Sequence, residues 1–478
     1  MRNYLIIDIG TSSLRVAIIN AKLEIINSRV LKRSAQACFD AEEEWKKIYQ
    51  MMKEVVQSES ADIAGISVSS LLGWVGTDES GNAVTPCYSY MHQFKEECEE
   101  FKEKYTDDII YPVSGRCISS ELSAFIILHL KNRQSDIYEK MSKMISLKDF
   151  VNMKITGTAA IDHTSACYTM LYDLKKQDWS QEILDYVGLD RTKLAKLIRP
   201  YEILGRVKAG IAQELGISQN TPVAAGSVDG STGILGAGAI EMGSAVSVMG
   251  TTDVFFMVKD ELVFDKNRSL IINPHVFPGL WLVGGPMGMY GGTLEWLLKN
   301  IMNQSLDMIQ MNERAALVPA GSGGVIFIPT LAGERTPFWL PSMRGTILGL
   351  EHKHKAENLF RAVMESNGYT IRRMAELGQA AGIRFNRVIA IGGGSKSDLW
   401  LQIKADIMGV DFERSAIEEA SMTGACLLIM LATGMKADHI QKMAEKKTFY
   451  SREKIKESYD VFYKKYMEVH DKACGLYL

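Results

Sequence analysis

The stretch Asp8-Ile9-Gly10-Thr11-Ser12-Ser13 lies between two apolar runs near the start of the chain. Tyr4-Leu5-Ile6-Ile7 predicts a buried strand, and Val16-Ala17-Ile18-Ile19 predicts its antiparallel return. The turn between them is small and polar, so its backbone N–H groups can wrap around phosphate oxygens. Asp8, at the end of the first strand, adds a carboxylate where a magnesium ion or its water shell would sit. A plain hairpin turn explains the same residues equally well.

A second copy of this pattern follows about half a chain later. Ala245-Val246-Ser247-Val248-Met249 leads into the turn Gly250-Thr251-Thr252-Asp253, and Val254-Phe255-Phe256-Met257-Val258 returns from it. Two equivalent strand, turn and strand units predict two similar domains that face one nucleotide. The pair is far more specific than either copy alone.

A helix rich in glycine and alanine is expected to begin at Ser231, directly after Asp229-Gly230 at the end of a buried strand. The small residues that follow would let other backbones approach this helix closely; they are Gly233, Gly236, Ala237 and Gly238. We place the domain boundary just beyond them, which gives domains of residues 1–242 and 243–478.

Composition and charge narrow the class of protein. The chain has 478 residues, of which 46% are hydrophobic, so two domains with substantial cores can form. A net charge of -3 gives no sign of the excess positive charge that binds nucleic acid or an anionic membrane. The seven cysteines are scattered without a CxxC pair, which favours reduced thiols in the cytoplasm. The first residues run straight into a core strand, so we expect neither a signal peptide nor, given the short apolar runs, a membrane span.

Two further glycine clusters favour contact with a flat ligand. Gly392-Gly393-Gly394-Ser395-Lys396-Ser397 follows the buried strand predicted at Arg387-Val388-Ile389-Ala390-Ile391, and a helix follows the cluster. Three glycines there let the backbone press against an adenosine, and Gly291-Gly292 at the start of another helix is a second surface of this kind. The spacing is not that of a dinucleotide-binding GxGxxG motif, and simple turn geometry remains an alternative.

At this point the sequence resembles the FGGY carbohydrate kinases, a family that includes xylulose, gluconate, ribulose and glycerol kinases. The resemblance covers essentially the whole chain and rests on motifs in the family's order: Asp8-Ile9-Gly10-Thr11, Asp229-Gly230, Gly250-Thr251-Thr252, Gly333-Glu334-Arg335-Thr336-Pro337-Phe338-Trp339, Gly392-Gly393-Gly394-Ser395-Lys396-Ser397 and Glu419-Ala420 with Gly424-Ala425. It implies an α/β, two-domain, actin-like and ribonuclease H-like ATPase fold with ATP and sugar in the interdomain cleft.

The resemblance also implies roles for these residues. Phosphoryl transfer needs the γ-phosphate held in line with an acceptor hydroxyl and its charge neutralised. Gly10, Thr11, Ser12 and Ser13 on one side and Gly250, Thr251 and Thr252 on the other would hold the phosphates, while Gly393, Gly394 and Ser397 match the adenosine pocket, with Gly291 or Gly292 facing it. Asp8 would hold Mg²⁺ through water.

Asp229 is our candidate for the general base that takes the proton of the sugar hydroxyl. Its alternative role is that of a helix N-cap ahead of Gly230. Arg15 is either a further phosphate ligand or a plain exposed strand residue. On this interpretation residues 1–242 carry the sugar site, the first phosphate loop and the base, and residues 243–478 carry the second phosphate loop and the adenosine site.

The acceptor site departs from the xylulose kinase pattern. Where xylulose kinases have Gln-Met-His after the first helix, this chain has Ser70-Leu71-Leu72, and the family's Trp-Asn-Asp-x-Arg becomes Tyr90-Met91-His92-Gln93-Phe94. Sites that read hydroxyls lose discrimination when such polar partners vanish. Leu71, Leu72, Trp74, Tyr90 and His92 form either a more apolar sugar pocket or part of the core with a surface histidine.

Two hypotheses follow for the function. The favoured one is ATP-dependent phosphorylation of a small ketose, polyol or sugar acid, with a xylulose-like sugar as the first choice. The alternative is a nucleotide-binding sensor or degenerate kinase of the same fold. Intact Asp8, Thr11, Asp229 and Thr251 favour the enzyme. The expected partners are ATP, Mg²⁺ and a small sugar or polyol, and a homodimer is left open.

Overall fold

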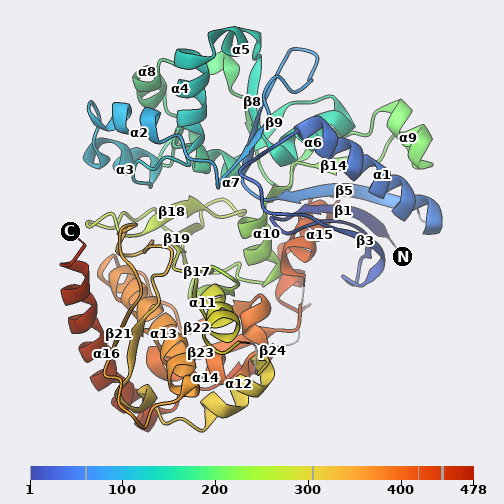
Figure 1. The fold of residues 1–478 in the computed structure, drawn as a ribbon. Helices are drawn as coiled ribbons and strands as arrows, with labels where there is room; N and C mark the ends of the chain where they lie inside the picture. Colours follow the sequence, from blue (N-terminus) through green and yellow to red (C-terminus); the bar gives the residue numbers. More distant parts are fainter. Residues whose placement is uncertain (1, 60–61, 304–305, 418, 443–445, 478) are drawn as a thin grey trace. The chain divides into compact units, whose positions relative to one another are not determined.

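The computed structural model describes the chain except for residues 1, 60–61, 304–305, 418, 443–445 and 478, and it divides into two compact units (Figure 1). The first unit contains Met1–Gly238, Asn273–Gly279 and Glu419–Met443, and the second contains Ala239–Ile272, Leu280–Glu418 and Ala444–Leu478. A late segment of the chain therefore belongs to the first unit. The expected boundary between residues 242 and 243 stays a prediction.

The first unit is built on a seven-stranded sheet. Its order is β13 (Ile203–Arg206), β14 (Pro222–Ala224), β5 (Ile63–Ser70), β1 (Asn3–Ile9), β2 (Ser13–Asn20) and β3 (Ile25–Lys32), with β15 (Ser227–Val228) also paired to β5. The predicted first hairpin is confirmed, because β1 and β2 are antiparallel with Asp8 opposite Arg15. β5 runs parallel to both β1 and β15, so these three strands end at the same edge of the sheet.

The second unit repeats the arrangement around its own seven-stranded sheet. The order is β18 (Ile271–Pro274), β19 (Trp281–Pro286), β17 (Asp253–Lys259), β16 (Ser244–Met249), β22 (Arg387–Ile391), β23 (Asp411–Ser415) and β24 (Lys446–Phe449). β16 is antiparallel to β17 and parallel to β22, just as β1 is antiparallel to β2 and parallel to β5. The second predicted hairpin is confirmed, and the two sheets share their central topology.

Helices and smaller sheets complete each unit (Figure 1). The first unit contains α1 (Ala41–Glu59), α2 (Lys95–Lys102), α3 (Asp107–Ser114), α4 (Ser123–Arg133), α5 (Ser135–Lys140), α6 (Leu147–Thr156), α7 (His163–Ala166), α8 (Gln181–Val187), α9 (Ala209–Leu215), α10 (Asp229–Gly236), α15 (Ala420–Ala432) and a sheet of β4 (Cys38–Phe39), β7 (Cys87–Ser89), β6 (Gly73–Thr77) and β8 (Lys143–Ser146). The second contains α11 (Tyr290–Trp296), α12 (Met308–Ala316), α13 (Ala356–Ala380), α14 (Asp398–Met408), α16 (Glu453–Cys474) and the pair β20 (Ile326–Ile328) and β21 (Thr346–Leu348).

The helix α15 packs against the sheet of the first unit and crosses α10 at very short range. A Cβ on Gly424 would lie 1.8 Å from the carbonyl oxygen of Thr232, and one on Gly236 would lie 2.0 Å from that of Ala420. The expected close approach at Gly236 is therefore confirmed. α15 is buried over most of its length, which explains why its sequence is almost wholly apolar. This crossing holds the late segment against the strand that carries Asp8.

Across the described ranges, every helix is either too short or too polar to traverse a bilayer.

We expect Gly424→Ala to destabilise the first unit by about 3 kcal/mol, because the added methyl group meets backbone rather than a side chain that can rotate away. Gly210→Ala is the matched control: it lies in α9, and its Cβ would have nothing within 4 Å. That change should stabilise the protein by up to about 1 kcal/mol through helix propensity. Urea unfolding of both variants tests this, and equal midpoints would contradict it.

Candidate active site

The first predicted phosphate loop is a closed, solvent-facing turn between β1 and β2. The Gly10 N–H donates to the Ser13 carbonyl oxygen at 2.9 Å, and Ser12 is exposed. The hydroxyl groups of Thr11 and Tyr90 lie 3.2 Å apart. Tyr90 is 38% exposed. This contact places Tyr90, which we expect near the sugar, beside the loop that we expect to hold phosphate.

Arg33, which the sequence did not single out, stabilises this turn through contacts with its backbone. Its guanidinium donates to the Gly10 carbonyl oxygen at 3.2 Å and pairs with the buried carboxylate of Glu44 at 3.0 Å. Its own N–H donates to the Ser12 carbonyl oxygen at 2.9 Å. The third strand could have indicated this role of Arg33, because Lys32 pairs with Ser13 and so brings the next residue, Arg33, to the turn.

Arg15 is engaged in an ion pair. Its guanidinium contacts the carboxylate of Glu419, the residue immediately before α15. Neither alternative from the sequence included this partner, since Glu419 is 404 residues away along the chain. Phosphate binding by Arg15 stays a prediction, and it would have to compete with Glu419.

Asp8 and Asp229 end parallel strands that flank β5. Asp8 lies beside Ser69, and Ser69 lies beside Ser227, two residues before Asp229. Asp8 is 7% exposed and Asp229 is half-buried. Asp229 is the first residue of α10 and its carboxylate accepts from the Gly230 N–H at 2.7 Å, whereas the N-cap is Val228. Asp229 therefore does not act as the N-cap that was its alternative role.

The surroundings of both carboxylates favour the protonated form. Burial raises the pKa of Asp229 to about 7, with a further contribution from the negative charge of Asp8. Burial raises the pKa of Asp8 to about 6, and Ser69 and Arg15 oppose the shift. Among the described residues, Oδ1 of Asp8 is buried without a hydrogen-bond partner. An unpartnered carboxylate oxygen near a second carboxylate fits a divalent cation or its water shell.

A buried polar network supports the segment that leads to Asp229. Lys148 pairs with Asp162 at 2.9 Å and donates to the Ala225 carbonyl oxygen at 3.2 Å. Asp162 accepts from the Thr164 N–H at 3.0 Å, and the Thr164 hydroxyl bonds to that of Ser227. The backbone before Asp229 is therefore fixed from behind. The sequence shows these residues only as polar side chains in apolar surroundings.

A second cluster that the sequence did not single out lies beside Asp229. The Arg116 guanidinium carbon is 4.0 Å from the centre of the Tyr168 ring, and Arg116 Nε donates to the Cys167 carbonyl oxygen at 2.9 Å. Asn273 donates to the Tyr168 hydroxyl at 3.0 Å and also bonds to Arg116. Burial raises the pKa of Tyr168 to about 12, and the negative charge of Asp229 adds to the shift. These groups are polar and lie near the candidate base.

The residues expected at the acceptor lie on neighbouring segments of the first unit, where the Tyr90 N–H donates to the Leu72 carbonyl oxygen at 2.9 Å. Leu71 and Trp74 are each 3% exposed, and Trp74 lies in β6 opposite Tyr88 and Ser146. Leu72 is half-buried. His92 is half-buried and packs against Tyr88 and Phe94 with ring centroids 5.2 and 4.5 Å apart. Burial lowers the pKa of His92. Trp74 is thus a core residue, and the contact of the others with a sugar stays a prediction.

The second unit brings its own predicted residues together around the turn between β16 and β17. A Cβ on Gly291 would lie 2.1 Å from the Gly250 carbonyl oxygen, and the Gly292 N–H donates to the Thr251 carbonyl oxygen at 3.0 Å. The start of α11 therefore packs directly on the turn that contains Gly250, Thr251 and Thr252. Only glycine at residue 291 permits this approach.

The triple glycine after β22 reaches the same region. A Cβ on Gly394 would lie 2.9 Å from the side chain of Met249, the residue before Gly250, whereas one on Gly393 would meet nothing within 4 Å. Ser397 caps α14 by accepting from the Trp400 N–H at 3.1 Å, and it donates to Asn312 at 2.5 Å. Gly393 thus leaves an open backbone surface beside the second turn, as the adenosine hypothesis requires.

Comparison with known families identifies the class of protein. The model of the FGGY family of carbohydrate kinases, N-terminal domain, matches residues 3–236, and that of the C-terminal domain matches residues 245–433. The chain therefore belongs to the FGGY family of carbohydrate kinases.

Relatives of several specificities are similar to the chain. It is 24% identical to a xylulose kinase of Bacillus subtilis, with 97% of this chain and 96% of that protein covered, and 27% identical to a gluconokinase of the same organism, with 91% and 88% covered. Among solved structures, a xylulose kinase from Lactobacillus acidophilus has a TM-score of 0.93 at 23% identity and covers 100% of this chain and 99% of that one. A glycerol kinase from Plasmodium falciparum with ADP reaches 0.90 at 21% identity and covers 98% of both chains. The predicted two-domain, actin-like ATPase fold is confirmed.

The raised pKa of Asp229 predicts how stability depends on pH. The unfolded carboxyl, with a pKa near 3.9, loses its proton before the folded one, so the free energy of unfolding falls as pH rises from about 4 to about 7. Asp229→Asn removes this penalty. We expect the variant to be about 2 kcal/mol more stable at pH 8, less than the full shift implies because Asp229 is half-buried, and equally stable below pH 4.

Urea unfolding between pH 4 and pH 8 measures this difference. Asp185→Asn, at an exposed carboxylate of α8, is the control and should change little. An Asp229→Asn protein that is no more stable than the unsubstituted chain at pH 8 would contradict the assignment of an unfavourable charge to Asp229.

Proposed function

We propose that this carbohydrate kinase transfers the γ-phosphoryl group of ATP to a hydroxyl of a small ketose, polyol or sugar acid, with Asp229 as general base. The observation that carries the proposal is the half-buried Asp229 at the end of a parallel strand, with a pKa of about 7 and Asp8 two strands away. A base with a pKa near the working pH balances the need to be ionised against the need to bind a proton. FGGY kinases are ATP-dependent, which supports the donor.

The proposed mechanism assigns one task to each set of residues. Ionised Asp229 accepts the proton of the attacking hydroxyl, and its fixed backbone aims the carboxylate. The turns at Gly10 to Ser13 and at Gly250 to Thr252 bind phosphate oxygens through their backbone N–H groups, except that of Gly10, which donates to the Ser13 carbonyl oxygen. Asp8 holds Mg²⁺ through water, and the ion supplies positive charge to the phosphates when bound. Gly291, Gly292, Gly393, Gly394 and Ser397 receive the adenosine.

For the molecule that accepts the phosphoryl group we propose a chemical class and not a single compound. A xylulose-like sugar remains the first choice because xylulose kinases are among the relatives, and a gluconokinase of similar identity keeps sugar acids in the set. Leu72 follows β5 where the xylulose kinase pattern has a histidine, and Leu71 stands where that pattern has a methionine. Tyr90 remains in the proposed site because it contacts Thr11. We also propose a cytoplasmic location, based on the scattered cysteines.

Asp229→Ala should lower kcat by about 10²- to 10⁴-fold, because the attacking hydroxyl loses its proton acceptor. The affinity for ADP should stay within a few-fold of the unsubstituted value. Steady-state kinetics and a separate nucleotide-binding titration measure the two effects, with Asp185→Asn as control. Acceptor-dependent turnover that survives in Asp229→Ala would remove Asp229 from the role of base.

The unsubstituted protein should release ADP in response to at least one member of a panel of pentuloses, hexuloses, polyols and aldonates. The rate should fall below pH 7 as Asp229 becomes protonated. A coupled ADP assay at fixed ATP and Mg²⁺ measures this. Nucleotide binding without stimulation by any member would favour the sensor hypothesis instead.

A further inference from the structure

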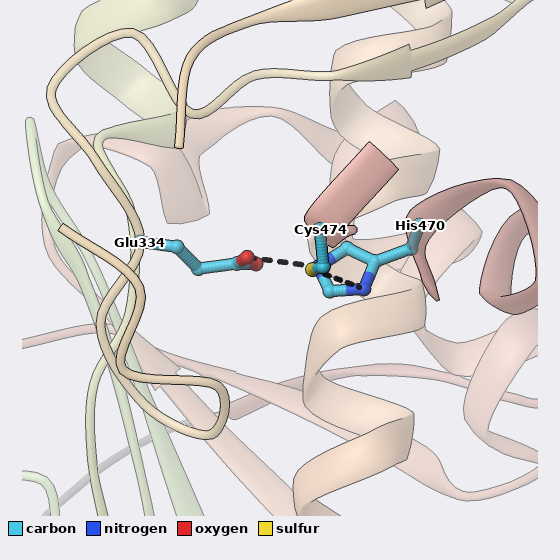
Figure 2. Close-up of side chains that lie close together, drawn as sticks. All are labelled: Glu334, His470 and Cys474. Carbon is cyan, nitrogen blue, oxygen red and sulfur yellow. Dashed lines mark hydrogen bonds and ion pairs between the residues drawn. The ribbon is translucent and has the colours of Figure 1, made fainter. Parts of the chain in front are cut away.

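Three side chains of metal-ligating type converge in the second unit, and none of them has a role in the kinase mechanism proposed above. Glu334 lies in the charged loop at residues 333–339, and His470 and Cys474 lie one turn apart on α16. Figure 2 shows the three side chains close together, with the Glu334 carboxylate directed toward the imidazole of His470 and the thiol of Cys474 beside that ring. Their ligand atoms lie within 4.8 Å of one another.

The distances are those of a compact cluster. Glu334 Oε2 is 2.8 Å from His470 Nε2, and Cys474 Sγ is 3.9 Å from the same nitrogen and 3.6 Å from Nδ1. The sulfur of Met343 lies 3.8 Å from Cys474 Sγ. His470 and Cys474 keep their spacing because residues four apart on a helix share a face.

Burial and charge around the cluster favour a cation. Glu334 is 4% exposed and His470 is fully buried, with the Phe338 ring centroid 3.9 Å from the imidazole. Asp471 places a second carboxylate oxygen 3.7 Å from His470 Nδ1. The Asp471 side chain is largely exposed, so Glu334 is the buried carboxylate beside this imidazole, and a buried carboxylate needs a positive partner.

We propose that Glu334, His470 and Cys474 form a binding site for a divalent cation of the zinc type. Zinc takes one carboxylate oxygen, one imidazole nitrogen and one thiolate at about 2.0–2.3 Å, and water takes the fourth position of a tetrahedron. At those bond lengths the Glu334 oxygen and the His470 nitrogen must separate by a few tenths of an ångström. Glu334 lies in a loop, so its side chain can make this movement.

The site is distinct in chemistry from the one proposed for Mg²⁺. Magnesium requires oxygen ligands, whereas imidazole and thiolate select softer ions. The bound ion would fasten the loop at residues 333–339 to the last turn of α16. This loop also packs on the end of β19, where the Thr336 N–H donates to the Pro286 carbonyl oxygen at 3.2 Å. The inference goes beyond the proposed kinase activity and does not depend on it.

The test uses Cd²⁺ as a zinc substitute with a thiolate signal. The full-length protein is treated with chelator, dialysed and titrated with Cd²⁺ while the ultraviolet thiolate-to-metal absorption is recorded. We expect a band that saturates at one equivalent and is lost in Cys474→Ser. Cys38→Ser, at an exposed cysteine of β4, is the matched control and should keep the band.

Two further measurements separate a metal site from a plain hydrogen bond between Glu334 and His470. Glu334→Gln keeps an acceptor for the imidazole but loses the anionic ligand, so Cd²⁺ affinity should fall at least about tenfold. Zn²⁺ should raise the thermal midpoint of the unsubstituted chain by a few degrees and leave that of Cys474→Ser unchanged. Circular dichroism verifies that each variant is folded, and Glu334→Gln decides the question if Cys474→Ser is not.

A saturable band that persists in Cys474→Ser, or no band in the unsubstituted chain, would overturn the site. Equal Cd²⁺ affinity in Glu334→Gln would do the same. None of these readouts involves turnover, so the result is independent of whether the kinase proposal holds.

Discussion

The proposed chemistry rests on the confinement of two carboxylates, Asp8 and Asp229, at one edge of a sheet. They end strands that both pair with β5, so the backbones are two strand spacings apart, about 10 Å. At an effective dielectric constant of about 20, two unit charges at that distance repel by roughly 1.7 kcal/mol, or just over one pKa unit. Burial is therefore the larger cause of the raised pKa of Asp229, and Asp8 is the smaller one. The strand order thus sets the position of the candidate base, and burial sets most of its basicity.

Behind this edge one buried cation faces two acids. Lys148 is fully buried between Asp149 and Asp162, and each of these acids has further donors. The network fixes the backbone from Ala225 to Ser227 in one position. At the front edge the excess is negative, which suits a site that receives a cation with its substrate. A fixed backbone behind the site and an excess of negative charge at its front edge suit phosphoryl transfer. In that reaction the protein positions groups more than it reacts with them.

What the sequence could predict was local. Both hairpins and the close packing at Gly236 depend on residues near one another, and each was confirmed. The single strand expected before Asp229 is instead two short strands, β14 and β15, and the helix expected from Ser231 begins at Asp229. The partners of those residues could not be predicted, because they come from distant segments. Glu419 reaches Arg15 only because α15 packs on the first sheet, and Arg33 reaches Gly10 only through the register of β3. Trp74 shows a different limit of the sequence: it lies close to a motif along the chain, but its side chain is buried in the core.

Contacts between segments that are distant in the sequence also bear on substrate choice. Leu72 replaces the histidine that the xylulose kinase pattern has after β5, yet Asp229 does not stand in apolar surroundings. Tyr168, fixed by Arg116 and Asn273, lies close enough to Asp229 for that negative charge to raise the pKa of the Tyr168 hydroxyl. These three residues come from a segment before α4, from the 3-10 turn that follows α7 and from β18, so no single motif contains them. The cluster places polar side chains near the candidate base, in contrast to the leucines after β5. Buried polar partners discriminate between ligands by orders of magnitude where apolar contacts do not, so the cluster and the leucines differ in kind as surroundings of the base.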